Sequence, residues 1–161
     1  MFKWIGLAVL CLLVPVSAQA QQSTLSPADY EEIRGLYARY CYGFDNGDSE
    51  MVAGVYAADA TFLMGGKVMG DSREKIAANV RPPAAGSPAS KHVPSNIVIE
   101  PSSDGATGTS YVVLMAFETG KAPVVTGGGS YASSFVKTPD GWRFKSRNYT
   151  PFGSHPAATT P

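Results

Sequence analysis

The chain has 161 residues, with 13 basic and 13 acidic side chains, so its formal net charge is zero. This length favours a single domain, and 44% apolar with 16% charged residues is typical of a folded globular protein. Basic residues are scattered among acidic ones, which argues against nucleic acid as a partner because phosphate binding requires clustered positive charge. Two cysteines, Cys11 and Cys41, cannot form a disulfide scaffold or a multi-cysteine zinc site.

Residues 1–20 are typical of a secretory signal peptide. Lys3 supplies the positive start, residues 5–16 are apolar, and Ala18-Gln19-Ala20 is a small-x-small cleavage site. The apolar stretch is shorter than the ~20 residues that span a bilayer. We therefore expect an exported protein, periplasmic or secreted, with no membrane segment after cleavage.

A long helix is predicted at the start of the mature chain. Ser26 can cap it, Pro27 suits its first position, and Asn46-Gly47 can end it. Large side chains recur every three or four residues and therefore share one stripe. They are Tyr30, Ile33, Tyr37, Tyr40 and Phe44.

Shorter elements and then four strands are predicted after this helix. The shorter elements are a helix from Asp48 or Ser49 to about Tyr56, strands over 60–64 and 67–70, a helix starting at 71–74 and ended by Pro82-Pro83, and a loop over 82–90. The four strands cover 92–100, 107–118, 124–137 and 142–149, and turn residues separate them as in an antiparallel meander. This order predicts an α+β domain over residues 21–153, followed by a disordered tail over 154–161.

A curled sheet and one long helix are expected to leave a space between them. Its predicted lining is Tyr37, Tyr40, Phe44, Phe62, Met64, Met115 and Phe117. Apolar walls with few polar groups are usual for a small-molecule site. The same residues could instead fill a solid core.

Several motifs resemble the SnoaL-like branch of the nuclear transport factor 2-like superfamily. They are Tyr40-x4-Asp45, Asp59-Ala60-Thr61-Phe62, a histidine, His92, opening a strand, and Gly141-Trp142-Arg143-Phe144. The resemblance covers residues 26–150 and implies a cone-shaped, curved antiparallel sheet wrapped around N-terminal helices. Because this fold hosts dehydratases, isomerases, hydrolases, cyclases and binding proteins, it does not by itself imply one function.

Within this family, scytalone dehydratase, the bile-acid dehydratases and a dehydrochlorinase pair an aspartate ending the first helix with a histidine opening a strand. Asp45 and His92 stand at these positions, and the resemblance makes them candidate catalytic residues. It also implies substrate-binding roles for Tyr40 and Arg147, which match residues of the bile-acid enzymes.

Phe62 and Met64 complete the candidate substrate-binding residues. Scytalone dehydratase has further pocket tyrosine and histidine groups where this chain has Met64 and Ser110. Its substrate and full catalytic set are therefore not implied for this chain.

An aspartate–histidine pair suits β-elimination or isomerisation. Histidine, with a pKa of ~6.5, can accept a proton near neutral pH, and an aspartate on its other ring nitrogen fixes the tautomer. We expect a lyase (dehydratase) or isomerase that needs no metal or organic cofactor, acts on a small apolar molecule, and forms a homodimer as members of the resembled family do. Alternatively, Asp45 caps a turn and His92 is a loop-edge residue, in which case the chain is a non-catalytic binding or dimerisation module.

Overall fold

The first helix begins and ends where its capping residues place it. In the computed structural model, which describes residues 24–153, α1 covers Pro27–Asn46. The side chain of Ser26 accepts the backbone N–H of Asp29, while the Asp29 carboxylate accepts the N–H of Ser26 at 2.9 Å, which completes a capping box. Gly47 ends the helix with a left-handed φ of 72°. The predicted signal peptide and the predicted tail lie outside the described residues.

The two short helices end earlier than the sequence predicts. α2 covers Ser49–Gly54 and α3 covers Arg73–Ala77. Beyond α2 the chain turns directly into a strand at Tyr56, whose side chain is fully buried. After α3, the side-chain amide of Asn79 donates to the carbonyl of Lys75 at 3.0 Å, so that carbonyl no longer requires a continuing helical turn.

The sheet has six strands in the order β2-β1-β6-β5-β4-β3. Its strands are β1 (Tyr56–Met64), β2 (Lys67–Gly70), β3 (Ala89–Ser102), β4 (Gly105–Phe117), β5 (Val124–Thr138) and β6 (Gly141–Pro151). β3 to β6 form the predicted antiparallel meander. β1 lies parallel to β6, so the sheet is mixed. This pairing is possible because a long stretch of chain connects the two strands, as parallel neighbours require.

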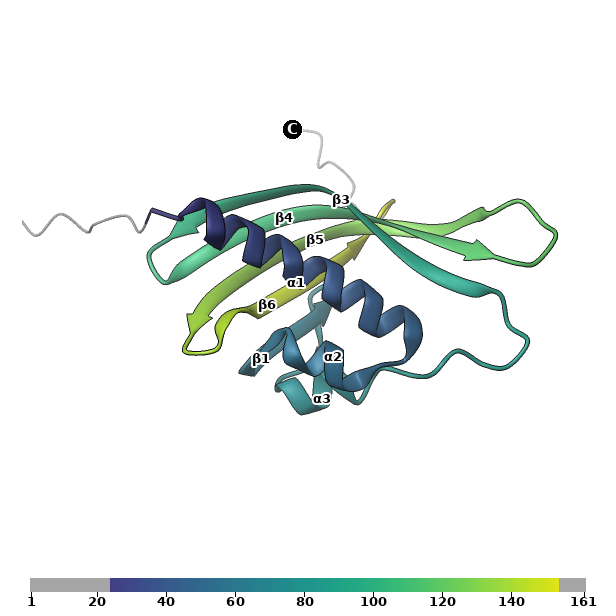
Figure 1. Cartoon of the computed structure of the whole chain (residues 1–161), viewed down its shortest axis with the longest axis horizontal. Coiled ribbons are helices and arrows are strands. Elements are labelled where there is room, and N and C mark those ends of the chain that lie inside the picture. Colours follow the sequence, from purple (N-terminus) through teal and green to yellow (C-terminus); the bar gives the residue numbers. More distant parts are fainter. Residues whose placement is uncertain (1–23, 154–161) are drawn as a thin grey trace, which may run out of the picture.

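α1 lies across the curved sheet (Figure 1). It contacts β3, β6 and α2, while α2 and α3 pack near β1. The interior between helix and sheet is filled at one end by fully buried side chains, which include Ile33, Leu36, Tyr37, Tyr56 and Phe144. Among the helices in residues 24–153, none is long and apolar enough to cross a bilayer.

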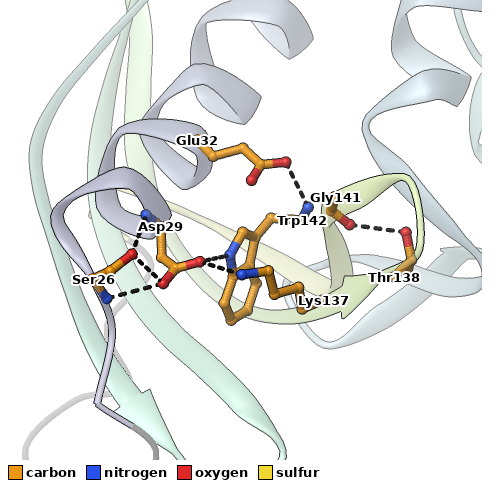
Figure 2. A network of polar contacts seen from close by, with 7 residues as sticks. All are labelled: Ser26, Asp29, Glu32, Lys137, Thr138, Gly141 and Trp142. Carbon is orange, nitrogen blue, oxygen red and sulfur yellow. Dashed lines mark hydrogen bonds and ion pairs between the residues drawn. The ribbon is translucent and has the colours of Figure 1, made fainter.

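A polar cluster fastens the first turn of α1 to the hairpin between β5 and β6 (Figure 2). Asp29 Oδ1 accepts hydrogen bonds from Lys137 Nζ and from Trp142 Nε1, both at 2.7 Å. Glu32 accepts the backbone N–H of Trp142 at 2.8 Å. We call Ser26, Asp29, Glu32, Lys137 and Trp142 the polar clamp. The clamp fixes the start of α1 on the sheet, at the end of the helix opposite to Asp45.

Candidate active site

Asp45 lies in the last turn of α1, and His92 lies near the start of β3. Gly47 lets the loop after α3 pass close to the end of α1, because a Cβ at this position would lie 2.4 Å from the Cα of Pro82. That loop leads directly into β3. The close approach therefore brings His92 next to Asp45, although the residues are 47 positions apart.

The two side chains are in contact. His92 Nδ1 lies 2.5 Å from Asp45 Oδ1, and the backbone N–H of His92 donates to Oδ2 at 3.0 Å. Only 13% of the His92 side chain and 6% of the Asp45 side chain are exposed. Since a carboxylate only accepts hydrogen bonds, the proton of a neutral His92 lies on Nδ1, and Nε2 keeps a free lone pair. No group within residues 24–153 forms a hydrogen bond to Nε2.

Aromatic rings hold the imidazole from two sides. The ring centroid of Phe44 lies 5.2 Å from that of His92 at an interplanar angle of 70°, and the ring of Tyr40 lies 6.4 Å away at 82°. Both are edge-to-face contacts, which are favourable for aromatic pairs. The carboxylate and the two rings together fix the position of the imidazole.

His92 borders a cavity of about 380 Å³. Its lining comes from α1, from the segment after α3 and from every strand: Tyr40, Phe44, Phe62, Met64, Met69, Asn79, Ser90, His92, Leu114, Tyr131 and Tyr149. This volume and the largely apolar wall are typical of small-molecule sites. The cavity can therefore enclose a compact, mostly apolar molecule against the imidazole.

A smaller cleft of about 190 Å³ lies on the other side of the aspartate–histidine pair. It shares Phe44, Ser90 and His92 with the larger cavity and adds polar residues and the loop after α3. Its remaining lining is Asp45, Arg81, Pro83, Ser87 and Pro88. His92 thus borders an apolar space on one side and a more polar space on the other.

The candidate residues from the sequence are not all at the cavity. Tyr40, Phe62, Met64 and His92 line it, and Asp45 lies behind His92 in the smaller cleft. Arg147 does not line either space, and it is fully buried. A direct substrate contact by this arginine, as the resemblance implies, is absent from the described geometry.

The Arg147 guanidinium is surrounded by aromatic rings. Its Cζ lies 3.7 Å from the ring centroid of Tyr131, 4.1 Å from that of Tyr40 and 4.7 Å from that of Phe144. Within the described residues, its three guanidinium nitrogens have no hydrogen-bond partner. Arg147 is therefore a buried cation stabilised by ring faces rather than by a carboxylate.

Two predicted lining residues are wrong because of strand parity. The alternating residues Ala106, Gly108, Ser110 and Val112 of β4 are buried, and Leu114 continues this alternation and lines the cavity. Met115 and Phe117 are not part of the lining, and Phe117 is exposed. Tyr37 belongs to the filled core below the cavity.

Sequence reasoning also missed Tyr131 and Tyr149, which line the cavity from β5 and β6. The alternation of β5, in which Tyr131, Ser133 and Phe135 are buried, is a signal that could have placed Tyr131 on the inner face. Asn79 and Met69 had no such signal, because they reach the cavity from a turn and from the short strand β2.

Burial makes the cysteine beside the site unreactive. Cys41 follows Tyr40 in α1, and burial raises the pKa of its thiol to about 11, so it remains protonated at neutral pH. No group of three or more His, Cys, Asp or Glu side chains within residues 24–153 is arranged to hold a metal ion. The polar groups that line the cavity and the smaller cleft include the His92 imidazole, the Asp45 carboxylate and the tyrosine hydroxyls.

Residues 26–148 match the SnoaL-like domain family. The chain belongs to this family. Its six-stranded curved sheet with N-terminal helices has the nuclear transport factor 2-like architecture of the solved structures that resemble it. None of the curated proteins compared with the chain matches it.

Several solved structures share this fold. A nuclear transport factor 2-like protein with a cystatin-like fold from Novosphingobium aromaticivorans is 25% identical, with a TM-score of 0.69 over 81% of this chain and 86% of that one. The protein Aln2 from a Streptomyces species is also 25% identical, with a TM-score of 0.68 over 80% and 94%. A second Novosphingobium protein, provisionally named a scytalone dehydratase, is 20% identical, with a TM-score of 0.64 over 77% and 84%.

Proposed function

We propose that this SnoaL-like protein is a lyase or isomerase that removes a proton from a small, mostly apolar substrate, with His92 as the base and Asp45 as its partner. The observation that carries this proposal is the 2.5 Å contact between His92 Nδ1 and Asp45 Oδ1, with His92 bordering a largely apolar cavity. The lone pair on Nε2 is then available to a bound molecule.

In an elimination, Nε2 of His92 takes a proton from the carbon next to an activating carbonyl. The electron pair of that C–H bond moves into an enolate, whose negative charge lies on the carbonyl oxygen. The enolate then re-forms the carbonyl, and its electron pair forms the new double bond as the C–O bond to the leaving hydroxyl breaks. The imidazolium that forms is stabilised by the Asp45 carboxylate and returns its proton to the leaving hydroxide, which departs as water. Returning the proton to a different carbon instead gives an isomerisation. Neither route requires a group beyond the chain and its substrate.

The provisional dehydratase name of one structural neighbour agrees with this chemistry, although that likeness concerns the fold alone. Apolar walls also favour it, because excluding water strengthens the electrostatic contacts made inside the cavity. Base catalysis by a positioned histidine typically contributes ~10²–10⁴-fold to a rate.

The proposal is tested by finding the molecule that the protein retains and then removing the base. Mass spectrometry of the purified protein identifies a retained molecule, and β-hydroxy ketones of matching size are assayed for enone formation by ultraviolet absorbance. His92→Ala should abolish turnover and leave ligand affinity nearly unchanged. His155→Ala provides the matched control, and it should turn over at the wild-type rate. Equal turnover by the wild type and His92→Ala would reject His92 as the base.

A second candidate function is non-catalytic binding of the same kind of molecule, which the largely apolar cavity wall favours. This function predicts tight binding of the retained molecule without conversion by either the wild type or His92→Ala. Product formation by the wild type would exclude it.

We further propose that the protein is exported and that it forms a homodimer. The sequence of residues 1–20 supports the export. The intact mass of protein recovered from outside the cytoplasm should lack these twenty residues, whereas retention of Met1–Ala20 would contradict cleavage. Light scattering of the mature protein should give twice the chain mass, and a monomer mass would contradict the dimer.

A further inference from the structure

The buried arginine behind the cavity requires an explanation. Transferring a guanidinium from water into the protein interior is costly unless it is paired. Arg147 is fully buried, its nitrogens lack hydrogen-bond partners within the described residues, and no carboxylate forms an ion pair with it there. Even a buried ion pair can often be replaced by apolar residues of similar size without loss of stability, and Arg147 has no ionic partner within the described residues to offset its burial. Stability alone therefore gives a weak reason for a cation at this position.

The rings that contact Arg147 connect it to the cavity. Its two nearest rings, those of Tyr131 at 3.7 Å and Tyr40 at 4.1 Å, both line the cavity. The centroids of these two rings are 6.5 Å apart. The Arg147 guanidinium thus lies behind the rings of Tyr40 and Tyr131, on the side away from the cavity. A molecule bound in the cavity therefore contacts the two tyrosines and not Arg147.

Two other polar side chains of the wall, Tyr149 and Asn79, have their donors occupied, and a third, Ser90, is exposed. The hydroxyl of Tyr149 donates to the carbonyl of Gly128 at 3.0 Å. The amide of Asn79 donates to two backbone carbonyls, at 3.0 and 3.2 Å. The buried hydroxyls left in the wall are those of Tyr40 and Tyr131. Burial raises the pKa of both phenols, so both remain protonated at neutral pH. The charge of Arg147 lowers the pKa of each phenol, and a hydrogen bond with Tyr40 also lowers that of Tyr131.

We propose that Arg147 is a positioning residue that acts through Tyr40 and Tyr131: its buried charge holds both rings and makes their hydroxyls favour a substrate oxygen that becomes negatively charged. This inference rests on the proposed function and adds the role of Arg147 at the same site: the carbonyl oxygen of the substrate carries the charge of an enolate after His92 removes the neighbouring proton, and the two hydroxyls are the groups that receive this charge. The cation is close enough to act on that charge without contacting the substrate.

The test compares two probes of nearly equal size, 4-nitrophenolate and neutral nitrobenzene, by calorimetric titration at a pH where the free nitrophenol is ionised. The wild type should bind 4-nitrophenolate more tightly than nitrobenzene. Arg147→Met should lose about 10-fold in affinity for the phenolate and keep its affinity for nitrobenzene. Arg147→Lys should lie between the two, because it keeps the charge and loses the planar stacking on the rings.

A thermodynamic cycle separates action through the phenols from a general effect of charge. In a Tyr40→Phe/Tyr131→Phe background, Arg147→Met should change phenolate affinity by less than about 2-fold. If Arg147→Met does not fold, the double tyrosine variant alone must lose the phenolate preference. An unchanged preference in either case overturns the inference, as does a wild type that binds neither probe or prefers nitrobenzene. Failure of the proposed function is seen separately, as turnover by His92→Ala at the wild-type rate.

Discussion

Replacing Asp45 with asparagine changes one oxygen of the carboxylate that contacts His92 into an NH₂ group. This change should move the ring proton of neutral His92 from Nδ1 to Nε2. The carboxylate accepts two N–H groups of the same residue, the backbone amide at 3.0 Å and Nδ1 at 2.5 Å. In Asp45→Asn, the single carbonyl oxygen satisfies the backbone amide, and the NH₂ group then faces Nδ1 of the ring. Nδ1 must accept that hydrogen bond, so the ring proton moves to Nε2 and the base loses its lone pair.

The expected loss equals the contribution of the base, ~10²–10⁴-fold in kcat, because the ring is present but cannot accept the proton. KM should change little, since Asp45 lines the smaller cleft and not the apolar cavity. Initial rates of enone formation near neutral pH measure this effect. Asp104→Asn, an exposed change in the turn between β3 and β4, is the matched control. A kcat for Asp45→Asn within about 3-fold of the control would refute the tautomer argument.

Three further changes test the cavity, the thiol and the polar clamp. Leu114→Trp should fill the cavity and weaken nitrobenzene binding at least ~10-fold, whereas Met115→Trp should not; equal effects would contradict the cavity lining. Burial raises the pKa of the Cys41 thiol to about 11, so little reactive thiolate is present at about pH 8. Cys41 should therefore react with iodoacetamide on the order of 100-fold more slowly in the folded than in the unfolded protein. Similar rates in the two states would contradict its burial. Asp29→Asn should lower Tm near neutral pH, while Asp140→Asn should not. Hydrogen bonding to Lys137 lowers the Asp29 pKa, so this Tm difference should shrink as pH falls below about 4; a constant difference would contradict the assigned role.

The helices and the meander follow from local signals in the sequence. Ser26, Pro27 and Gly47 bound α1 where their capping preferences predict, and the turn residues separate the long strands as expected. The parallel pairing of β1 with β6 has no local signal, because it joins segments from opposite ends of the domain. The curved sheet wrapped around the N-terminal helices was predictable only through the motifs that resemble the SnoaL-like family.

Side-chain placement in the site was harder to predict than the fold. Asp45 and His92 could be paired in advance only through the family resemblance, since the close approach at Gly47 that brings them together is a tertiary contact. Met115 was expected in the lining in place of Leu114 because a one-residue error in strand parity moves a side chain to the opposite face. Arg147 was expected at the substrate, and only the three-dimensional packing of the aromatic rings reveals that it is enclosed behind them.

Nitrogen NMR of the imidazole is the most direct test of the central claim, that His92 presents an unprotonated Nε2 to the cavity. His155→Ala removes the only other histidine, so the remaining ring signals belong to His92. At about pH 8 the spectrum should show a protonated Nδ1 and an unprotonated Nε2, and binding of a cavity ligand should shift the Nε2 signal. A ring protonated on Nε2, or an Nε2 signal that does not respond to a bound ligand, would contradict the account.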